Sequence, residues 1–80
     1  MTKKDLPEEL HKILKALGGR GSIIDICKAF WDLNKNDVES SGDLFYTWQY
    51  DIRWAATNLR QSLKMKSAKA SPRGIWELKK

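Results

Sequence analysis

The sequence has one cysteine, one histidine and no apolar run close to the length of a membrane span. Cys27 alone cannot form an internal disulfide, and the CxxC pairs or Cys/His clusters that bind zinc are missing. No apolar stretch approaches the roughly 20 residues that a transmembrane helix needs, and residues 1–5 lead into an amphipathic pattern rather than a signal peptide. We therefore expect a soluble, cytoplasmic protein without a metal or a cofactor.

Residue combinations that carry catalysis are also missing. His11 lies among charged neighbours with no arrangement of Ser, Cys or Asp around it, so we expect a surface residue and not a general base. Cys27 falls on an apolar helical face, which favours packing over nucleophilic chemistry. The glycines of residues 18–21 lack the preceding strand of a phosphate-binding loop. These absences predict a protein that is not an enzyme and has no small-molecule substrate.

The composition is that of one folded domain. Eighty residues suffice for a single modest core. Hydrophobic residues make up 41% of the chain and include four tryptophans, which is far more apolar than a disordered sequence. We expect one domain over residues 1–80.

Charge is distributed very unevenly along the chain. Residues 1–52 carry seven basic and nine acidic residues, for a net of −2, whereas residues 53–80 carry eight basic residues and one acidic residue, for a net of +7. The eight are Arg53, Arg60, Lys64, Lys66, Lys69, Arg73, Lys79 and Lys80. So basic a segment attracts polyanions, which favours nucleic acid or an anionic membrane surface over the alternative of a merely solubilising surface.

The hydrophobic pattern of the first half predicts two helices, at residues 6–17 and 23–33. Asp5 is expected to cap the first helix and Gly18-Gly19 to end it. Ser22, followed three residues later by Asp25, resembles a capping box for the second. The polar residues 34–43 predict a loop with at most one short helical turn.

The second half predicts a third helix and a β-hairpin. An uninterrupted apolar stripe indicates a helix over 47–63, and the pattern then alternates, indicating two strands within 64–79 with a loop at 70–73. This order predicts an α+β fold: a winged helix, in which a three-helix helix-turn-helix core is followed by a β-hairpin wing.

The third predicted helix carries the candidate reading face. In helix-turn-helix proteins the second helix of the motif enters the major groove of DNA, and that role falls here to residues 47–63. Arginine can bridge two acceptors of guanine, glutamine suits adenine, and lysine contacts phosphate. The candidates are Tyr50, Arg53, Thr57, Arg60, Gln61 and Lys64. The alternative for these residues is an ordinary solvated helix face.

The hairpin supplies further candidates. Lys66, Lys69 and Arg73 lie at or beside its tip, where a wing can contact the sugar-phosphate backbone. Trp76 and Leu78 alternate on one strand face and are expected to close the core beneath the wing. The predicted partner is therefore double-stranded DNA and not a membrane.

Two aromatic residues of the third helix leave a second function open. Trp54 is expected to be buried beneath the hairpin and the preceding loop, because a fully exposed indole leaves a large apolar area in water. Tyr50, one turn earlier, is the better candidate for contact with a ligand. The alternative function is a protein-interaction winged helix that uses the face of Tyr50 and Trp54.

Two stretches resemble the N-terminal winged-helix domain of Mrr-type restriction endonucleases. They are Tyr50-Asp51-Ile52-Arg53-Trp54-Ala55-Ala56-Thr57-Asn58-Leu59 and Arg73-Gly74-Ile75-Trp76-Glu77-Leu78. The opening Leu6-Pro7-Glu8-Glu9-Leu10 and the Ser41-Gly42 pair fit the same pattern. The resemblance implies duplex DNA recognition in a restriction or defence setting, by a module joined to a separate nuclease domain. Whether the module acts as a homodimer stays open.

The chain departs from that family at two places. Ser62-Leu63-Lys64 stands where the family tends to have an Ala-Gly-Leu-like turn. Lys79-Lys80 replaces the threonine and glycine that commonly follow the last strand. These departures bear more on the biological setting than on the fold.

Overall fold

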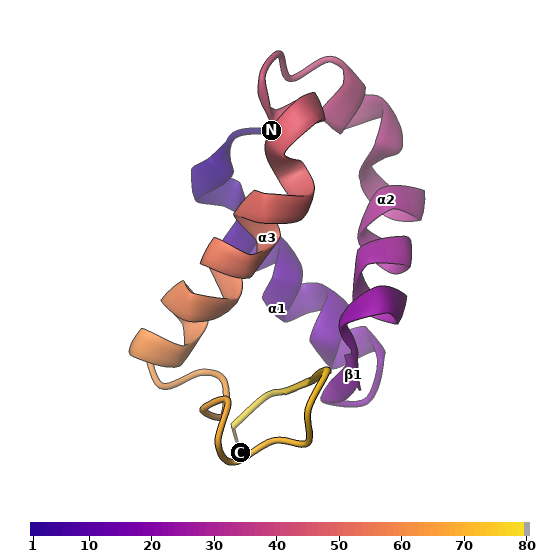
Figure 1. Cartoon of the computed structure of the whole chain (residues 1–80). Coiled ribbons are helices and arrows are strands. Elements are labelled where there is room, and N and C mark those ends of the chain that lie inside the picture. The colour runs from indigo at the N-terminus through magenta and orange to yellow at the C-terminus, as the bar shows by residue number, and fades with distance from the viewer. Residues whose placement is uncertain (80) are drawn as a thin grey trace.

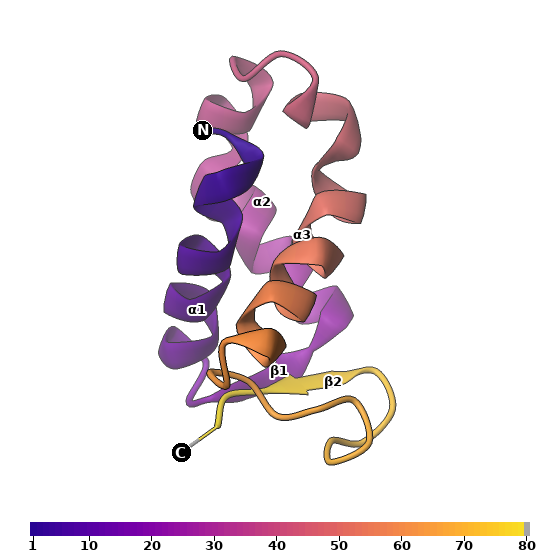
Figure 2. The same cartoon turned by 90° about the vertical axis from the view of Figure 1, so that its left-hand side faces the viewer.

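Over residues 1–79, which the computed structural model describes, the chain forms three α-helices and a two-stranded antiparallel sheet (Figures 1 and 2). In chain order the elements are the short 3-10 helix η1 (Lys3–Asp5), α1 (Leu6–Ala16), β1 (Arg20–Ser22), α2 (Ile23–Glu39), α3 (Leu44–Gln61) and β2 (Ile75–Glu77). The fold is therefore α+β, as the sequence predicts. Lys80, one of the eight basic residues of the C-terminal segment, lies outside the described residues.

The core lies among the three helices, each of which packs against the other two. Its largest fully buried side chains are Leu6, Leu10, Leu14, Ile26, Phe30, Val38 and Ile52. The sheet lies across the lower end of the helices in Figure 2, and Trp76 of β2, 5% exposed, joins the core there. Burial of Trp76 and packing of the half-buried Leu78 against the same core confirm the prediction made for both residues.

Most of the helix boundary signals are confirmed. Pro7 lies in the first turn of α1, and Gly18 and Gly19 have φ of 87° and 97° after its end. Ser22 caps α2 by accepting a hydrogen bond from Asp25 N at 3.0 Å. The expectation that Asp5 caps α1 is wrong: its carboxylate instead accepts a bond from Thr2 N at 2.8 Å and caps η1, because the 3-10 turn leads directly into α1.

Helix α2 continues for six residues beyond the predicted end at residue 33. Val38 is completely buried on the same face as Phe30, and Asn34 Nδ2 donates to Phe30 O at 3.1 Å. The intervening residues are mostly polar and exposed, so their composition is typical of a loop. Val38 nevertheless falls at a helical spacing from Phe30, and its burial keeps this segment in the helix. The predicted loop over 34–43 is therefore wrong for residues 34–39.

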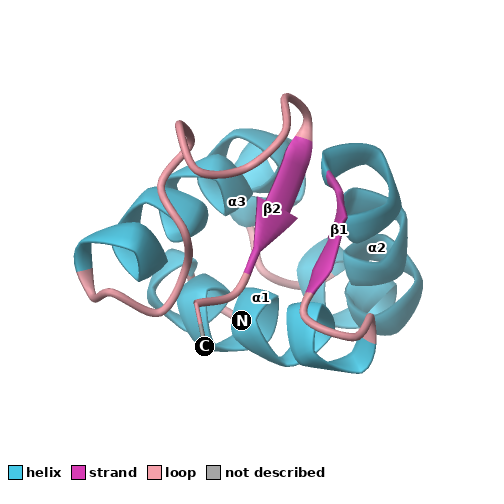
Figure 3. Ribbon diagram, turned by 90° about the horizontal axis from the view of Figure 1, so that it is seen from below, coloured by secondary structure: helices cyan, strands magenta, loops and turns pink. Residues whose placement is uncertain are grey.

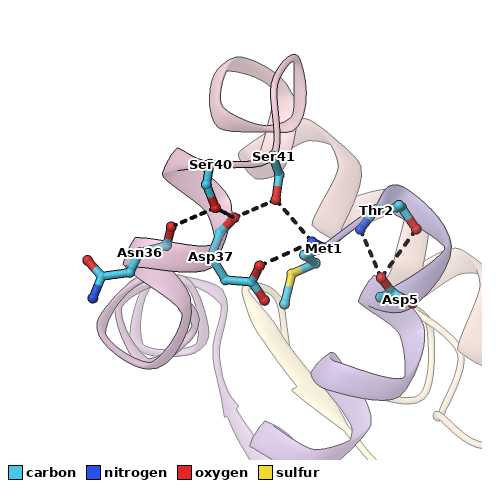
Figure 4. Close-up of polar contacts among 7 residues, drawn as sticks. All are labelled: Met1, Thr2, Asp5, Asn36, Asp37, Ser40 and Ser41. Atoms are coloured by element: carbon cyan, nitrogen blue, oxygen red, sulfur yellow. Dashed lines mark hydrogen bonds and ion pairs between the residues drawn. The ribbon is translucent and has the colours of Figure 1, made fainter.

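Polar contacts join the N-terminus to the C-terminal end of α2 (Figure 4). The Met1 ammonium lies 3.1 Å from Asp37 Oδ1 and donates to Ser41 Oγ at 3.1 Å. The hydroxyls of Ser40 and Ser41 donate to main-chain oxygens of the last turn of α2, including Asp37 O. These bonds satisfy carbonyl groups that a helix end leaves without an internal partner.

Helix α3 begins earlier and ends earlier than predicted. Leu44, 6% exposed, belongs to its first turn, so the helix starts three residues before Thr47. At the other end Leu63 has φ of +62° and is 69% exposed. Lys64 N donates to Leu59 O at 2.9 Å and Leu63 N to Arg60 O at 3.0 Å, the bond pair of a Schellman motif. Leu63 therefore ends the helix and does not extend its apolar stripe.

The predicted hairpin over residues 64–79 is confirmed only at its base, and the strand that pairs with β2 along its length is a different one. β2 pairs with β1 from between the first two helices, with Arg20 opposite Glu77 and Ser22 opposite Ile75 (Figure 3). Within 64–79, all of it described, one isolated bridge joins Met65 and Leu78, and no strand forms over residues 64–69. β1 escaped prediction because three residues with a central glycine show no alternation and are typical of a turn.

Candidate nucleic-acid interface

The outer face of α3 collects four of the predicted site residues. Tyr50, Arg53, Thr57 and Gln61 are all exposed and follow one another at three- and four-residue spacing, so they form one stripe. Tyr50 is 76% exposed. Opposite them lies the buried stripe of Leu44, Trp48, Ile52, Ala55, Ala56 and Leu59. We call this exposed stripe, together with Tyr46 one turn before Tyr50, the α3 face.

Tyr46 extends the α3 face by one turn and was missed in the sequence. It is 82% exposed and lies four residues before Tyr50, with its ring 5.0 Å from that of Phe45 in an edge-on arrangement. The four-residue spacing to Tyr50 is the signal that could have found it. The predicted loop ended at residue 43 and the predicted helix began at residue 47, so Tyr46 was assigned to neither.

The α3 face carries no carboxylate of its own helix. Asp51, the acidic residue of α3, lies on the opposite side and is 8% exposed. Its Oδ2 accepts a bond from Thr47 Oγ1 at 2.7 Å, and Lys3 Nζ lies 3.9 Å from its Oδ1. The exposed side therefore presents arginine, phenol, hydroxyl and amide groups, a combination that suits an anionic partner.

Main-chain contacts hold two side chains of the α3 face along the helix. Arg53 Nη1 donates to Gln49 O at 3.3 Å, and Thr57 Oγ1 donates to Arg53 O at 3.2 Å. Such contacts restrict the rotamers of exposed side chains, so less conformational entropy is lost when a ligand binds.

Arg60 and Lys66 have structural partners that the sequence did not reveal. Arg60 is half-buried, and its Nε donates to Lys66 O at 3.3 Å. Lys66 Nζ lies 3.2 Å from Glu77 Oε2, so its charge is largely balanced inside the protein. Both residues fix the segment after α3 to the rest of the fold, which weakens the expectation that they serve chiefly as contacts to DNA.

The other basic candidates are exposed on the segment that follows α3. Lys64, Lys69 and Arg73 all reach solvent. Arg73 also lines, with Arg60, a depression of about 430 Å³ between the end of α3 and the loop before β2. The structure thus brings an arginine of α3 and an arginine of the loop to one depression, although 13 positions separate them in the sequence.

Trp54 is half-buried, but the N-terminal segment covers it. Lys3 Nζ lies 4.7 Å from the centre of the Trp54 ring, a cation–π contact. The expected burial of Trp54 is therefore found in part, and the contact that the structure shows over its ring comes from Lys3. Tyr50 and Trp54 do not form one free aromatic surface.

A groove of about 630 Å³ lies between α2 and α3, beside the α3 face. It is lined by Ile23, Ile24, Cys27, Lys28, Trp31, Asp32, Trp48, Gln49 and Arg53. Burial raises the pKa of the Cys27 thiol, and the positive charge of Arg53 opposes part of that rise. Cys27 thus packs as a neutral thiol. The groove has no sequence signal, because its lining comes from two helices whose crossing the sequence does not specify.

The described residues contain neither a candidate metal cluster nor a helix that could span a membrane. Over residues 1–79 no three or more His, Cys, Asp or Glu side chains are grouped so that they could hold a metal ion. Of the helices that the structure describes, none has the length and apolarity to cross a membrane. Comparisons with protein-family models, with curated proteins and with solved structures each find no match.

Proposed function

We propose that the chain is a non-catalytic DNA-binding module that places α3 in the major groove of double-stranded DNA. The observation that carries the proposal is the α3 face: exposed, uncharged or basic, and continuous over four turns. The major groove is about 12 Å wide and admits an α-helix, and each of these side-chain types has a partner on a base edge or a phosphate. The +7 charge of residues 53–80 adds long-range attraction to the phosphates.

The topology supports a winged helix as the finer description of this fold. A strand between the first two helices pairs with the C-terminal strand, and the Met65–Leu78 bridge begins a second pairing at the point where a wing would leave the core. Residues 67–74 then form the wing, a loop in place of a second strand. Lys69 and Arg73 on this loop contact the sugar-phosphate backbone, which positions the module without reading sequence.

Within the α3 face the residues divide by chemistry. Tyr50, Thr57 and Gln61 face base edges, and Arg53 bridges guanine acceptors or a phosphate. The resemblance to the Mrr-type N-terminal domain supports a restriction or defence setting, with a nuclease domain attached to this module or a second copy bound beside it.

DNA binding measured across a salt series tests the proposal. The variant replaces Arg53, Lys64 and Lys69 by glutamine, because all three are exposed. The matched control replaces Lys4, Lys15 and Lys35, which are exposed elsewhere and remove the same charge. Each lost phosphate contact should reduce the steepness of log K against log salt by about 0.9, so the variant should lose about 1.8 if Arg53 contacts guanine and about 2.7 if it contacts a phosphate, and the control much less. Equal slopes for the two variants would refute the proposed interface.

One observation favours a second function, the binding of another protein. Tyr46 and Tyr50, 82% and 76% exposed, leave two phenol rings in water on one side of α3, and tyrosine is enriched at protein interfaces. Replacing both by alanine separates the two functions. Loss of duplex affinity supports DNA binding, whereas unchanged affinity assigns these rings to a protein partner.

A further inference from the structure

The groove between α2 and α3 has the size of a small-molecule site. The two helices are joined by the turn at the top of Figure 1, and the groove between them measures about 630 Å³. Ligand sites for small molecules typically measure about 300–1,000 Å³. At its lower end Ile23 N donates to Gly74 O at 2.9 Å, which fixes the start of α2 against the loop before β2.

Aromatic rings make one wall of the groove rigid. Trp48 stacks with both Phe30 and Trp31, with ring centres 5.2 Å and 5.6 Å away. Trp31 also contacts Phe45 across the two helices at 6.4 Å, near the turn that joins them. These contacts hold Trp31, half-exposed, in one orientation beside the groove. A planar apolar ring can pack against this wall without first ordering it.

The rim of the groove combines uncovered apolar surface with positive charge. Ile24 is 68% exposed at the rim, where an occupant would cover it. Lys28 on α2 and Arg53 on α3 line opposite sides of the groove. These two positive charges exceed the one negative charge in the lining, that of Asp32. The charge of Arg53 reaches the interior, since it acts on the thiol of Cys27. An apolar body with a negative group matches this lining.

We infer that the groove binds a small aromatic anion whose ring packs on Trp31 and Ile24 and whose anionic group pairs with Arg53. Arg53 suits this role better than Lys28, because its planar guanidinium binds a carboxylate or sulfonate with two parallel hydrogen bonds. Its bond to Gln49 O holds the side chain beside the groove. Because Arg53 also belongs to the α3 face, the occupant competes with DNA. This last step rests on the proposed function.

Two fluorescent probes test the site without any DNA. 8-Anilinonaphthalene-1-sulfonate is an aromatic anion, and N-phenyl-1-naphthylamine has the same aromatic body without the charge. The anion should bind the folded protein saturably at one site. Arg53→Gln should lower the affinity for the anion about tenfold, which is the scale of one charge-assisted hydrogen bond at an exposed site. It should lower the affinity for the neutral probe less than about twofold. Lys15→Gln, an equal loss of charge on α1, is the control.

Two further measurements locate the bound anion. Cys27, the one cysteine of the chain, lines the groove, so saturating 8-anilinonaphthalene-1-sulfonate should slow its alkylation by iodoacetamide. Ile24→Glu adds a carboxylate at an exposed rim position and should abolish binding of the anion while the far-ultraviolet circular dichroism is unchanged. If Arg53→Gln and Lys15→Gln bind the anion equally, or if Cys27 is not protected, the inference is wrong.

A competition titration separates this site from the proposed function. If duplex DNA binds, saturating anion should raise its apparent dissociation constant at least about tenfold, since one contact residue is occupied. Probe binding without DNA binding would contradict the proposed function and leave the groove site intact. If duplex DNA binds and the anion does not change its affinity, the proposed competition is wrong, whereas the groove site and the proposed function both remain.

Discussion

Replacing Leu63 by glycine should stabilise the protein, because Leu63 holds a backbone conformation that favours glycine. Its φ is +62°, and this left-handed conformation costs a residue with a Cβ about 1–2 kcal/mol. The side chain is 69% exposed, so its removal uncovers little additional apolar surface. Glycine gains freedom in the unfolded chain, which opposes the effect by about 0.5–1 kcal/mol. The net gain should be about 0.5–1 kcal/mol.

Thermal and urea unfolding followed by circular dichroism measure this change. In a domain of this size, 1 kcal/mol corresponds to a shift of about 4–8 °C in Tm. Leu63→Ala is the matched control, because it removes the same exposed side chain but keeps the Cβ. The glycine variant should therefore exceed the alanine variant in stability by about 0.5–1 kcal/mol. If the alanine variant is equally stable or more stable, the backbone argument for the end of α3 is wrong.

Three further predictions concern the core and the groove. Gly21→Ala should change the stability by less than about 1 kcal/mol in urea unfolding, since its Cβ would lie 3.1 Å from Cδ1 of Leu17, an exposed side chain that can move away; a loss above about 2 kcal/mol would contradict this packing. Trp76→Ala should cost about 3–5 kcal/mol, because the buried indole closes the core beneath the sheet; a loss below 1 kcal/mol would place Trp76 outside the core. Burial raises the pKa of Cys27 above its ordinary value of 9.0, so the folded state holds this proton more tightly than the unfolded state. Stability from this group is complete below pH 9.0 and declines as the pH rises through the higher folded value, and Cys27→Ser should remove that decline in a series of unfolding curves.

Local signals in the sequence predicted the parts of the fold that depend on neighbouring residues. The apolar period of α1, its glycine terminator and the Ser22 cap act within a few positions, so each was visible without the structure. The extension of α2 was not, because one buried residue, Val38, outweighs five polar neighbours. β1 was missed because its three residues carry no local strand pattern. They form a strand only because β2, more than 50 positions later, pairs with them.

The candidate interface divides in the same way. The 100° spacing of a helix predicted that Tyr50, Arg53, Thr57 and Gln61 share an exposed face. The partners of the remaining basic residues were beyond prediction, because the bond from Arg60 to Lys66 O and the pairing of Lys66 with Glu77 depend on how the chain returns after α3. The groove beside Arg53 forms where α2 and α3 approach each other, so the sequence of neither helix alone predicts it.

Site-specific photocrosslinking tests the central claim, that the α3 face binds duplex DNA. p-Benzoylphenylalanine replaces Tyr50 in one variant and Leu33 of α2 in another, since the two side chains are similarly exposed at 76% and 72%. Each variant is irradiated with a labelled duplex. The proposal predicts a strong crosslink from position 50 and little from position 33. Equal yields, or a crosslink from position 33 alone, would contradict it.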